Sequence, residues 1–263
     1  MLSTMLRAGV AIALAASASV AVAQQPAKPE CLVGAKPGGG CDLTCRLAGT
    51  ALANAKLLEK PLAVNYMEGG VGAVAMNHIV GSRPAEGGLL VAASSGSALL
   101  LAQKKFGNND ENSVRWVAAL GADFGAIVVA ADSPHKTLKD LVEAIKKSPN
   151  DFPVAGGGAV GSQDWMKLAM IWKAAGHDPR TMRYIALEGG GPVITNLQGG
   201  HVKIGSSEIS EFAPHHKAGK VRVLAVMTDK RLPGDVADVP TAKEQGYDLD
   251  WTVWRGVYLG PKV

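Results

Sequence analysis

Five short segments rich in glycine or serine are the residues most able to do chemistry in this 263-residue sequence. Each lies between an apolar run typical of a strand and a stretch with helical spacing. Glycine lets a ligand approach the backbone, and the free N–H groups at the start of a helix favour an anion. The pattern predicts an anion site built from several loops, which are Lys36–Asp42, Glu68–Gly72, Ser94–Ser97, Gly156–Gln163 and Glu188–Pro192.

Tight turns alone would also explain the glycines of any single segment, and this alternative stays open for each one. This explanation is weaker for the five segments taken together, because all of them follow the carboxyl end of a predicted strand, where open α/β sheets bind ligands. Asp42 and Ser162 are residue types that cap helix N-termini. We therefore expect Asp42 to be structural, whereas Ser162 either caps its helix or contacts the ligand.

Patterns typical of enzymes are incomplete. Gly200–Ser206 has the first spacing of a phosphate-binding P-loop, but Ser206 stands where lysine is required. Ala92–Gly96 approximates the strand–turn–helix motif of a nucleophilic serine, Ser94, yet alanine replaces its first glycine. The histidines show no metal-binding spacing. We expect no catalytic residue, no metal and no cofactor, and keep a Ser94 hydrolase as the alternative outside the binding proteins.

The N-terminus has the features of a secretory signal peptide. Arg7 precedes an uncharged run over residues 8–23 that ends in Ala21-Val22-Ala23 and is shorter than the roughly 20 residues of a membrane span. We expect cleavage after Ala23 and a periplasmic product. The formal net charge of +4 is too weak and too evenly spread to indicate a nucleic-acid partner.

Three cysteines lie close together, at Cys31, Cys41 and Cys45. Disulfides persist in exported proteins, so one bridge from Cys31 to Cys45 or to Cys41, with one thiol left over, is one interpretation. The alternative, in which all three thiols are free, stays open.

Apolar runs alternate with helical stretches, which is typical of an α/β protein with mainly parallel strands. The strand candidates are residues 32–35, 62–66, 89–93, 126–131, 153–155, 182–186, 202–205 and 221–226. Helical spacing of apolar residues predicts two packed faces. One is made of Leu43, Leu47, Ala51 and Ala55, and the other of Trp165, Leu168, Trp172 and Ala175.

Two pairs of glycine motifs repeat with nearly the same offset. Gly38–Gly40 and Gly156–Gly158 are 118 positions apart, and Glu68–Gly70 and Glu188–Gly190 are 120 apart. The repeat suggests two lobes built on one plan of strand, glycine loop and helix, with the ligand in the cleft between them. We expect lobe 1 to comprise residues 24–130 plus 224–263, and lobe 2 residues 131–223.

The chain resembles the extracytoplasmic solute receptors of the tripartite tricarboxylate transporters, and most of all their tricarboxylate-binding component. The resemblance extends from Cys31 to Val263 and rests on residues 35–40, 66–73, 161–167, 188–191 and 231–234. It implies a two-lobed periplasmic binding protein, type II-like, that closes on a carboxylate and delivers it to the membrane subunits of the transporter.

The resemblance also implies that loop amides and small hydroxyls hold a tricarboxylate such as citrate. The matching positions are Pro37, Gly38, Gly39, Ser94 and Ser97 in lobe 1 and Gly158, Ser162, Gln163, Gly189, Gly190 and Ser207 in lobe 2. Lys36 and Arg255 are the cations expected near a third carboxylate. A receptor for a dicarboxylate or another small organic acid, and a sensor subunit, remain alternatives.

Two features depart from the family pattern. Cys41 stands where many relatives carry Phe or Thr, so ligand contact at this position is open. The family's fold continues for several dozen residues past the position of Val263, and we expect the sequence to be a fragment whose first lobe lacks its closing helices.

Overall fold

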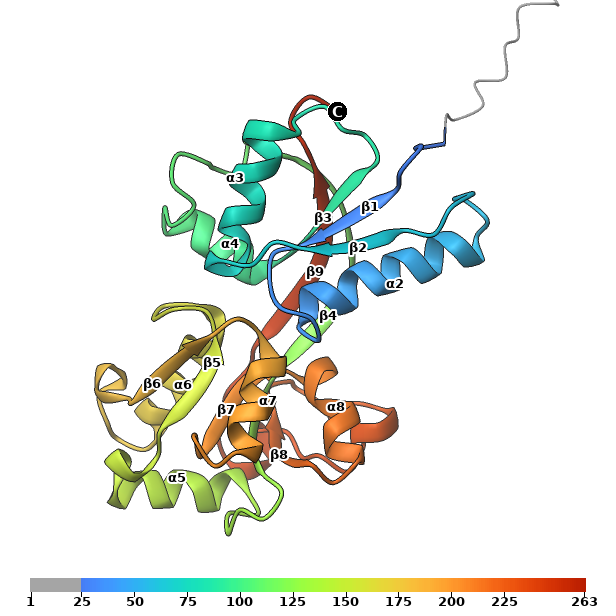
Figure 1. The fold of residues 1–263 in the computed structure, drawn as a ribbon. Helices are drawn as coiled ribbons and strands as arrows, with labels where there is room; N and C mark the ends of the chain where they lie inside the picture. Colours follow the sequence, from blue (N-terminus) through green and yellow to red (C-terminus); the bar gives the residue numbers. More distant parts are fainter. Residues whose placement is uncertain (1–24) are drawn as a thin grey trace, which may run out of the picture.

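A computed structural model of the protein describes residues 25–263, and the predicted signal peptide lies outside the described residues. Two lobes are joined by a pair of long strands that run from one lobe into the other (Figure 1). Of the described residues, no helix is long and apolar enough to cross a membrane.

Each lobe is an α/β unit. Lobe 1 contains β1 (Glu30–Val33), α2 (Gly40–Asn54), β2 (Ala63–Tyr66), α3 (Ala73–Ser82), β3 (Leu89–Ser94) and α4 (Ser95–Ala102). Lobe 2 contains α5 (Leu138–Lys147), β5 (Val154–Gly157), α6 (Gln163–Ala174), β6 (Tyr184–Leu187), α7 (Gly190–Gln198), β7 (Ile204–Glu208), α8 (Ile209–Lys217) and β8 (Val221–Val226). The connecting strands are β4 (Arg115–Ala130) and β9 (Thr252–Leu259).

One sheet runs through both lobes in the order β2-β1-β3-β9-β4-β7-β5-β6, with β8 also paired to β4. The first part of β4 pairs with β9 as far as Phe124, and the part from Gly125 onward pairs with β7 and β8. A single strand thus belongs to both lobes, and the sheet is continuous across the boundary between them.

The repeat predicted from the glycine motifs is confirmed by the topology. The order β2-β1-β3 in lobe 1 matches β6-β5-β7 in lobe 2, and all four of these pairings are parallel. The expectation of mainly parallel sheets needs correction, because every pairing of β4 and β9 is antiparallel.

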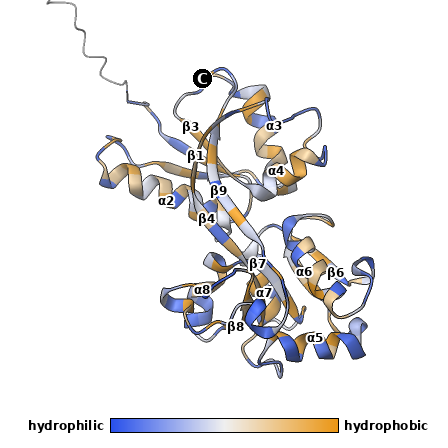
Figure 2. Cartoon of the chain, turned by 180° about the vertical axis from the view of Figure 1, so that it is seen from behind, coloured by the Kyte–Doolittle hydropathy of each residue, from blue (hydrophilic) through white to orange (hydrophobic). Residues whose placement is uncertain are grey.

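The central strands of each lobe are buried on both faces, which explains their continuous apolar runs in the sequence. Along β4, Ile127 and Val129 face a core with α5 and α6, while Ala126 and Val128 face a second core with α7 and α8. Figure 2 shows α5 as a helix with one apolar and one polar side, as expected for a helix that covers a sheet.

All eight predicted strands are present, but the sequence interpretation missed β9 and the first half of β4. The segment over β9, Thr-Val-Trp-Arg-Gly-Val-Tyr-Leu, is rich in strand-forming residues and carried a usable signal. The first eight residues of β4 are exposed, so no pattern of buried positions marks them.

The expected division at residues 130 and 224 is not the one that the packing produces. Met227, Ala242 and Leu249 belong to the same core as Leu141 and Trp172 of lobe 2. The chain returns to lobe 1 only through β9, whose Thr252 pairs with Phe124. Because β8 ends inside the sheet of lobe 2, the residues that follow it pack on that lobe first.

One predicted helix face is confirmed and the other is wrong. Leu168, Trp172 and Ala175 are buried in lobe 2, with Trp165 packed against them. Leu43 and Leu47 are instead 37% and 59% exposed, and α2 turns Thr44, Cys45 and Ala48 inward. The reason is the disulfide between Cys45 and Cys31, which fixes that side of α2 on β1 and leaves Cys41 as the free thiol.

We expect the disulfide to stabilise lobe 1 substantially. Its partners are 14 positions apart, and closing a loop of this size contributes about 3 kcal/mol. The double variant Cys31→Ala/Cys45→Ala should lose about this amount in urea unfolding without reductant. Cys41→Ser, which keeps the bridge, is the control, and an equal unfolding midpoint for the double variant and this control would contradict the prediction.

Candidate functional site

The glycine loops of both lobes meet at one cavity. The carboxyl ends of β1 and β3 face those of β5, β6 and β7, and a cavity of about 50 Å³ lies between them. Its lining comes from both lobes and consists of Ala35, Gly39, Gly40, Cys41, Val71, Ser94, Gly157, Gly158, Gln163, Asp164, Glu188, Gly189, Ser207, Glu208, Glu211 and Arg255.

The structure brings together part of the residue set named from the sequence. The members that line the cavity are Gly39, Ser94, Gly158, Gln163, Gly189, Ser207 and Arg255. The members that lie outside its lining are Lys36, Pro37, Gly38, Ser97, Ser162 and Gly190. Of the acidic residues of the lining, Glu188 lies in one of the loops predicted from the sequence, whereas Asp164, Glu208 and Glu211 were not assigned to the site. The one local signal for these three was the pair Asp164 and Lys167, two charged residues three apart beside an apolar stripe.

The lobes touch each other around the cavity. Gln103 Nε2 donates to the carbonyl of Gly161 at 3.0 Å, and Lys105 Nζ donates to the carbonyl of Val160 at 3.0 Å. At another point of the rim, the backbone N–H of Lys36 donates to the carbonyl of Glu188 at 3.4 Å. These contacts join the two lobes directly, in addition to the strands β4 and β9.

Three loop amides are occupied by carboxylates of the chain itself. Gly38 N donates to Asp42 Oδ2 at 2.8 Å, and Gly157 N donates to Asp164 Oδ2 at 2.6 Å. Gly190 N, at the start of α7, donates to Glu211 Oε2 at 2.8 Å. The structural role expected for Asp42 is therefore confirmed, and the amides of Gly38 and Gly190 already have an anionic partner.

Two serines named from the sequence cap helices. Ser162 Oγ accepts from Trp165 N at 3.4 Å in α6 and donates to the carbonyl of Gly157 at 2.8 Å. Ser94 Oγ accepts from Gly96 N at 3.2 Å at the start of α4. None of the described residues that line the cavity is a histidine, so the Ser–His pair typical of serine hydrolases is not formed at Ser94.

A buried ionic network forms the floor of the cavity. The fully buried ammonium of Lys167 lies 2.6 Å from Asp164 Oδ1 and 2.8 Å from Glu208 Oε1. The guanidinium of Arg255, on β9, lies 2.7 Å from Glu208 Oε2, and its two other carboxylate partners are Asp123 at 3.1 Å and Glu211 at 3.5 Å.

The protonation of these carboxyls follows from their neighbours. Burial would raise the pKa of Glu208, but Lys167 and Arg255 outweigh it and hold this pKa at about 2. Burial raises the pKa of Asp164 to about 6 against the pull of Lys167. Burial and the adjacent Glu208 raise the pKa of Glu211 well above its usual value, so Glu211 holds a proton most readily.

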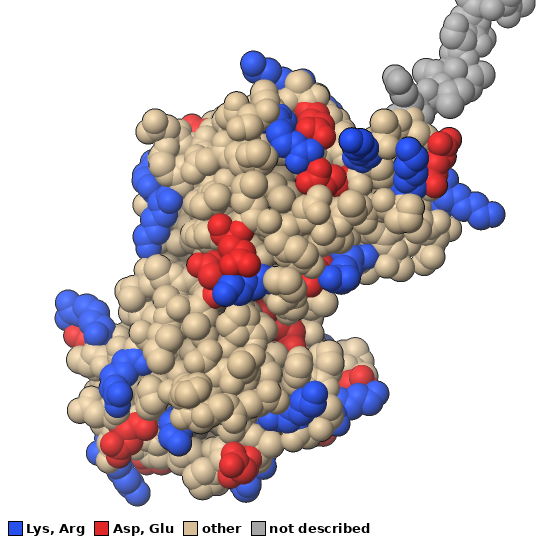
Figure 3. All heavy atoms as spheres, viewed as in Figure 1, with Lys and Arg blue, Asp and Glu red and all other residues tan. Residues whose placement is uncertain are grey.

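The two cations expected near a third carboxylate already face acids of the chain. Lys36 is half-exposed and lies 3.9 Å from Glu68, whereas Arg255 is engaged by three carboxylates. Figure 3 shows charges of both signs scattered over one face of both lobes, with acidic and basic groups side by side at the waist. The described residues contain no group of three or more His, Cys, Asp or Glu placed to hold a metal ion.

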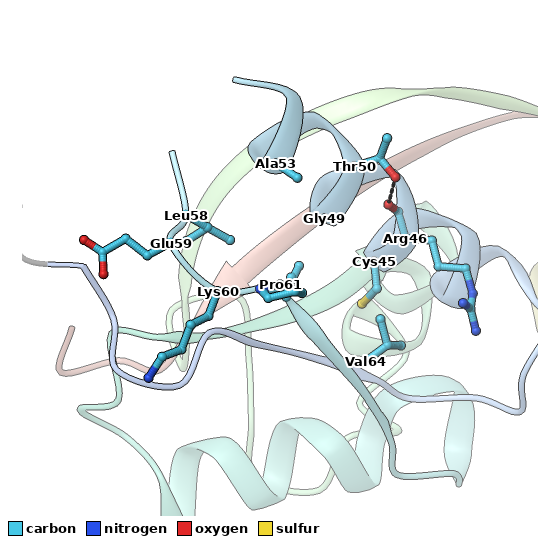
Figure 4. Close-up of a pocket in the computed structure, with 11 residues that line it drawn as sticks. Cys45, Arg46, Gly49, Thr50, Ala53, Leu58, Glu59, Lys60, Pro61 and Val64 are labelled. Atoms are coloured by element: carbon cyan, nitrogen blue, oxygen red, sulfur yellow. Dashed lines mark hydrogen bonds between the residues drawn. The ribbon is translucent and has the colours of Figure 1, made fainter. Parts of the chain in front are cut away.

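A larger hollow lies on the outside of lobe 1, between α2 and the segment that leads into β2 (Figure 4). Its volume is about 590 Å³. Figure 4 shows Glu59 and Lys60 at one end and Arg46 at the other, and these side chains do not converge on one point. Arg46 is bound to Asp42, so this hollow lacks the convergent polar groups of the cavity between the lobes.

The fold and the cavity define a two-lobed solute-binding protein. Similar solved structures include the periplasmic binding protein BugD, with a TM-score of 0.77 and 22% identity over 88% of this chain and 75% of that one. MatC from Rhodopseudomonas palustris with bound malate also has a TM-score of 0.77 and 22% identity, over 89% of this chain and 78% of that one.

The chain belongs to the tripartite tricarboxylate transporter family receptors, whose family model matches residues 47–263. A relative, the UPF0065 protein in the gbd 5' region of Cupriavidus necator, is 29% identical over 97% of this chain and 77% of its own length. The resemblance stated from the sequence is confirmed. The family consists of receptors that work with transporter membrane subunits, not of enzymes.

Removing Lys167 should destabilise the protein in a pH-dependent way. Loss of one partner from a buried ion pair costs about 3–5 kcal/mol, so Lys167→Met should lose about this much in urea unfolding at pH 7.5. Without the ammonium, the pKa of Asp164 should rise further above about 6. A carboxyl whose folded pKa is raised contributes stability at low pH and loses it as the pH rises, so the defect should be smaller at pH 5.

Lys173→Met is the matched control, because Lys173 is exposed on the same helix. It should change stability by less than about 0.5 kcal/mol at either pH. A loss for Lys167→Met that is as large at pH 5 as at pH 7.5 would contradict the assigned electrostatic role.

Proposed function

We propose that this protein is exported to the periplasm by its N-terminal signal peptide, captures a small carboxylate between its lobes and delivers it to the membrane subunits of a tripartite tricarboxylate transporter. One observation carries the proposal. In a chain of this receptor family, the first turns of a helix from each lobe line the same cavity, with Gly40 and Cys41 from α2 and Gln163 and Asp164 from α6.

The geometry supports anion capture by backbone groups. The first N–H groups of a helix have no partner within it, and the helix dipole adds favourable potential at the same place. Gly39 caps α2 without a side-chain hydrogen bond, so nothing from that residue covers the first turn. The free amides of α2 are therefore the strongest candidates to hold one carboxylate of the ligand.

A citrate-like tricarboxylate, implied by the family resemblance, is one candidate ligand within this proposal. A dicarboxylate is another, since the similar structure of MatC holds malate. Support for a third carboxylate is weaker than for the first, because Arg255 and Lys36 are already paired with acids of the chain. We also propose a division into two lobes whose boundary lies where β4 and β9 pair, near Phe124 and Thr252, in place of the predicted boundaries at residues 130 and 224.

Gly39→Ala should weaken ligand binding without unfolding the protein. Gly39 has an ordinary φ of −84°, and a Cβ there would lie 3.8 Å from both Glu211 Oε2 and Gly189 Cα. The added methyl group therefore fits the backbone but occupies the space where the lobes meet. We expect about a tenfold loss of affinity, about 1.4 kcal/mol, by isothermal titration with citrate, malate, succinate and adipate.

Gly81→Ala is the control, because a Cβ at this position of α3 would meet nothing within 4 Å. It should bind like the unmodified protein. If the protein, freed of any co-purified ligand by unfolding and refolding, binds no small carboxylate, the proposed function is wrong. If Gly39→Ala and Gly81→Ala bind the ligand equally well, the ligand binds somewhere other than this cavity.

A further inference from the structure

One side chain in the cavity has an acceptor with no partner. Gln163 is only 8% exposed, and its Nε2 donates to Glu208 Oε1 at 2.7 Å. A carboxylate with pKa held low can only accept, so this bond fixes which way the amide of Gln163 points. Its Oε1 is then left as a buried oxygen without a hydrogen-bond partner among the described residues.

The unpaired oxygen lies where the two lobes meet. Gln163 belongs to α6 of lobe 2, and a Cβ on Gly96 of α4 in lobe 1 would lie 2.7 Å from its Oε1. Gln163 also lines the cavity. Because a buried acceptor without a donor is unfavourable, the site is complete only when a ligand supplies an N–H or O–H group there.

The charges around this oxygen determine which kind of hydrogen-bond donor on a ligand is favoured. Four carboxyl groups line the cavity, from Asp164, Glu188, Glu208 and Glu211, against one guanidinium, that of Arg255. Lys167 adds one positive charge beneath them. Because Glu211 holds a proton most readily, the carboxylates of Asp164, Glu188 and Glu208 outnumber these two cations by one charge. A positively charged donor therefore gains Coulomb energy that a neutral hydroxyl does not.

The pKa shifts of the acidic side chains agree with this excess of negative charge. Burial raises the pKa of both Asp164 and Glu211, and for Glu211 the second cause is the adjacent Glu208. A positive group in the cavity would favour the ionised form of each, and a purely anionic ligand would oppose it.

Resting on the proposed function, we propose that the ligand is an amino carboxylate. Its carboxylate binds the free amides at the start of α2, and its ammonium group donates to Gln163 Oε1 among the acidic side chains of lobe 2. Such a ligand contacts both lobes through groups of opposite charge, so it stabilises the closed arrangement more than a plain dicarboxylate does.

The test compares ligands that share one carbon skeleton. Succinate, malate and aspartate differ only in carrying hydrogen, hydroxyl or ammonium at one carbon, and glutarate and glutamate form a second pair. Isothermal titration should show the amino form binding at least tenfold more tightly than its partners on the skeleton that fits. If succinate or malate binds as tightly as aspartate, and glutarate as tightly as glutamate, the inference is overturned while the proposed function holds. If no carboxylate binds at all, both are overturned.

Gln163→Met removes the acceptor and keeps a side chain of similar length. It should reduce affinity for the preferred amino acid at least tenfold more than it reduces affinity for the unsubstituted acid. Gln198→Met, at the exposed end of α7, makes the same change outside the cavity and should leave both affinities unaltered. Matching far-ultraviolet circular dichroism and urea midpoints show that the variants are folded. If Gln163→Met keeps the preference for the amino form, the inference is wrong.

Discussion

The buried ionic network at the floor of the cavity is the interaction on which the rest of the site depends. Glu208 joins its two halves, because one of its oxygens meets Lys167 and the other meets Arg255. Removing Lys167 would leave the buried carboxyl of Asp164 without a cationic partner, which costs several kcal/mol. The network also holds Glu211 beside the start of α7 and Asp164 beside the loop after β5. It therefore decides which loop amides face a ligand and which are satisfied within the protein.

The strands β4 and β9 connect this network to the movement that a two-lobed receptor needs. Arg255 lies on β9 opposite Gly121 of β4, and its carboxylate partners Glu208 and Glu211 belong to lobe 2. Over residues 25–263, β4 and β9 are the only part of the continuous sheet that both lobes share, so bending there moves one set of glycine loops relative to the other. The same strands place a positive charge at the base of the cavity, where it is compensated by acids rather than exposed to the ligand.

Much of the fold was predictable because it is encoded by local patterns. Apolar runs mark the strands from β1 to β8 except the exposed first half of β4, and the stripe ending in Trp172 and Ala175 marks a packed face of α6. The matching offsets of the glycine motifs revealed the duplicated plan before any topology was known. The exposed side of α2 was not predictable, because its orientation follows from a disulfide whose pairing the sequence leaves open. The lobe boundary was missed for a similar reason, since the packing of Met227 and Leu249 depends on where β8 ends in the sheet.

The sequence by itself determined the existence and position of the glycine loops, because a strand, a turn and a helix start are specified by neighbouring residues. It also determined the receptor family, through motifs spread along most of the chain. Only the tertiary structure decided which of the loop amides and cations are available. The carboxylate that occupies the amide of Gly190 comes from Glu211, and one that neutralises Arg255 comes from Asp123, which is 132 positions away. Contacts of this kind depend on how two lobes pack, and no local pattern in the sequence records them.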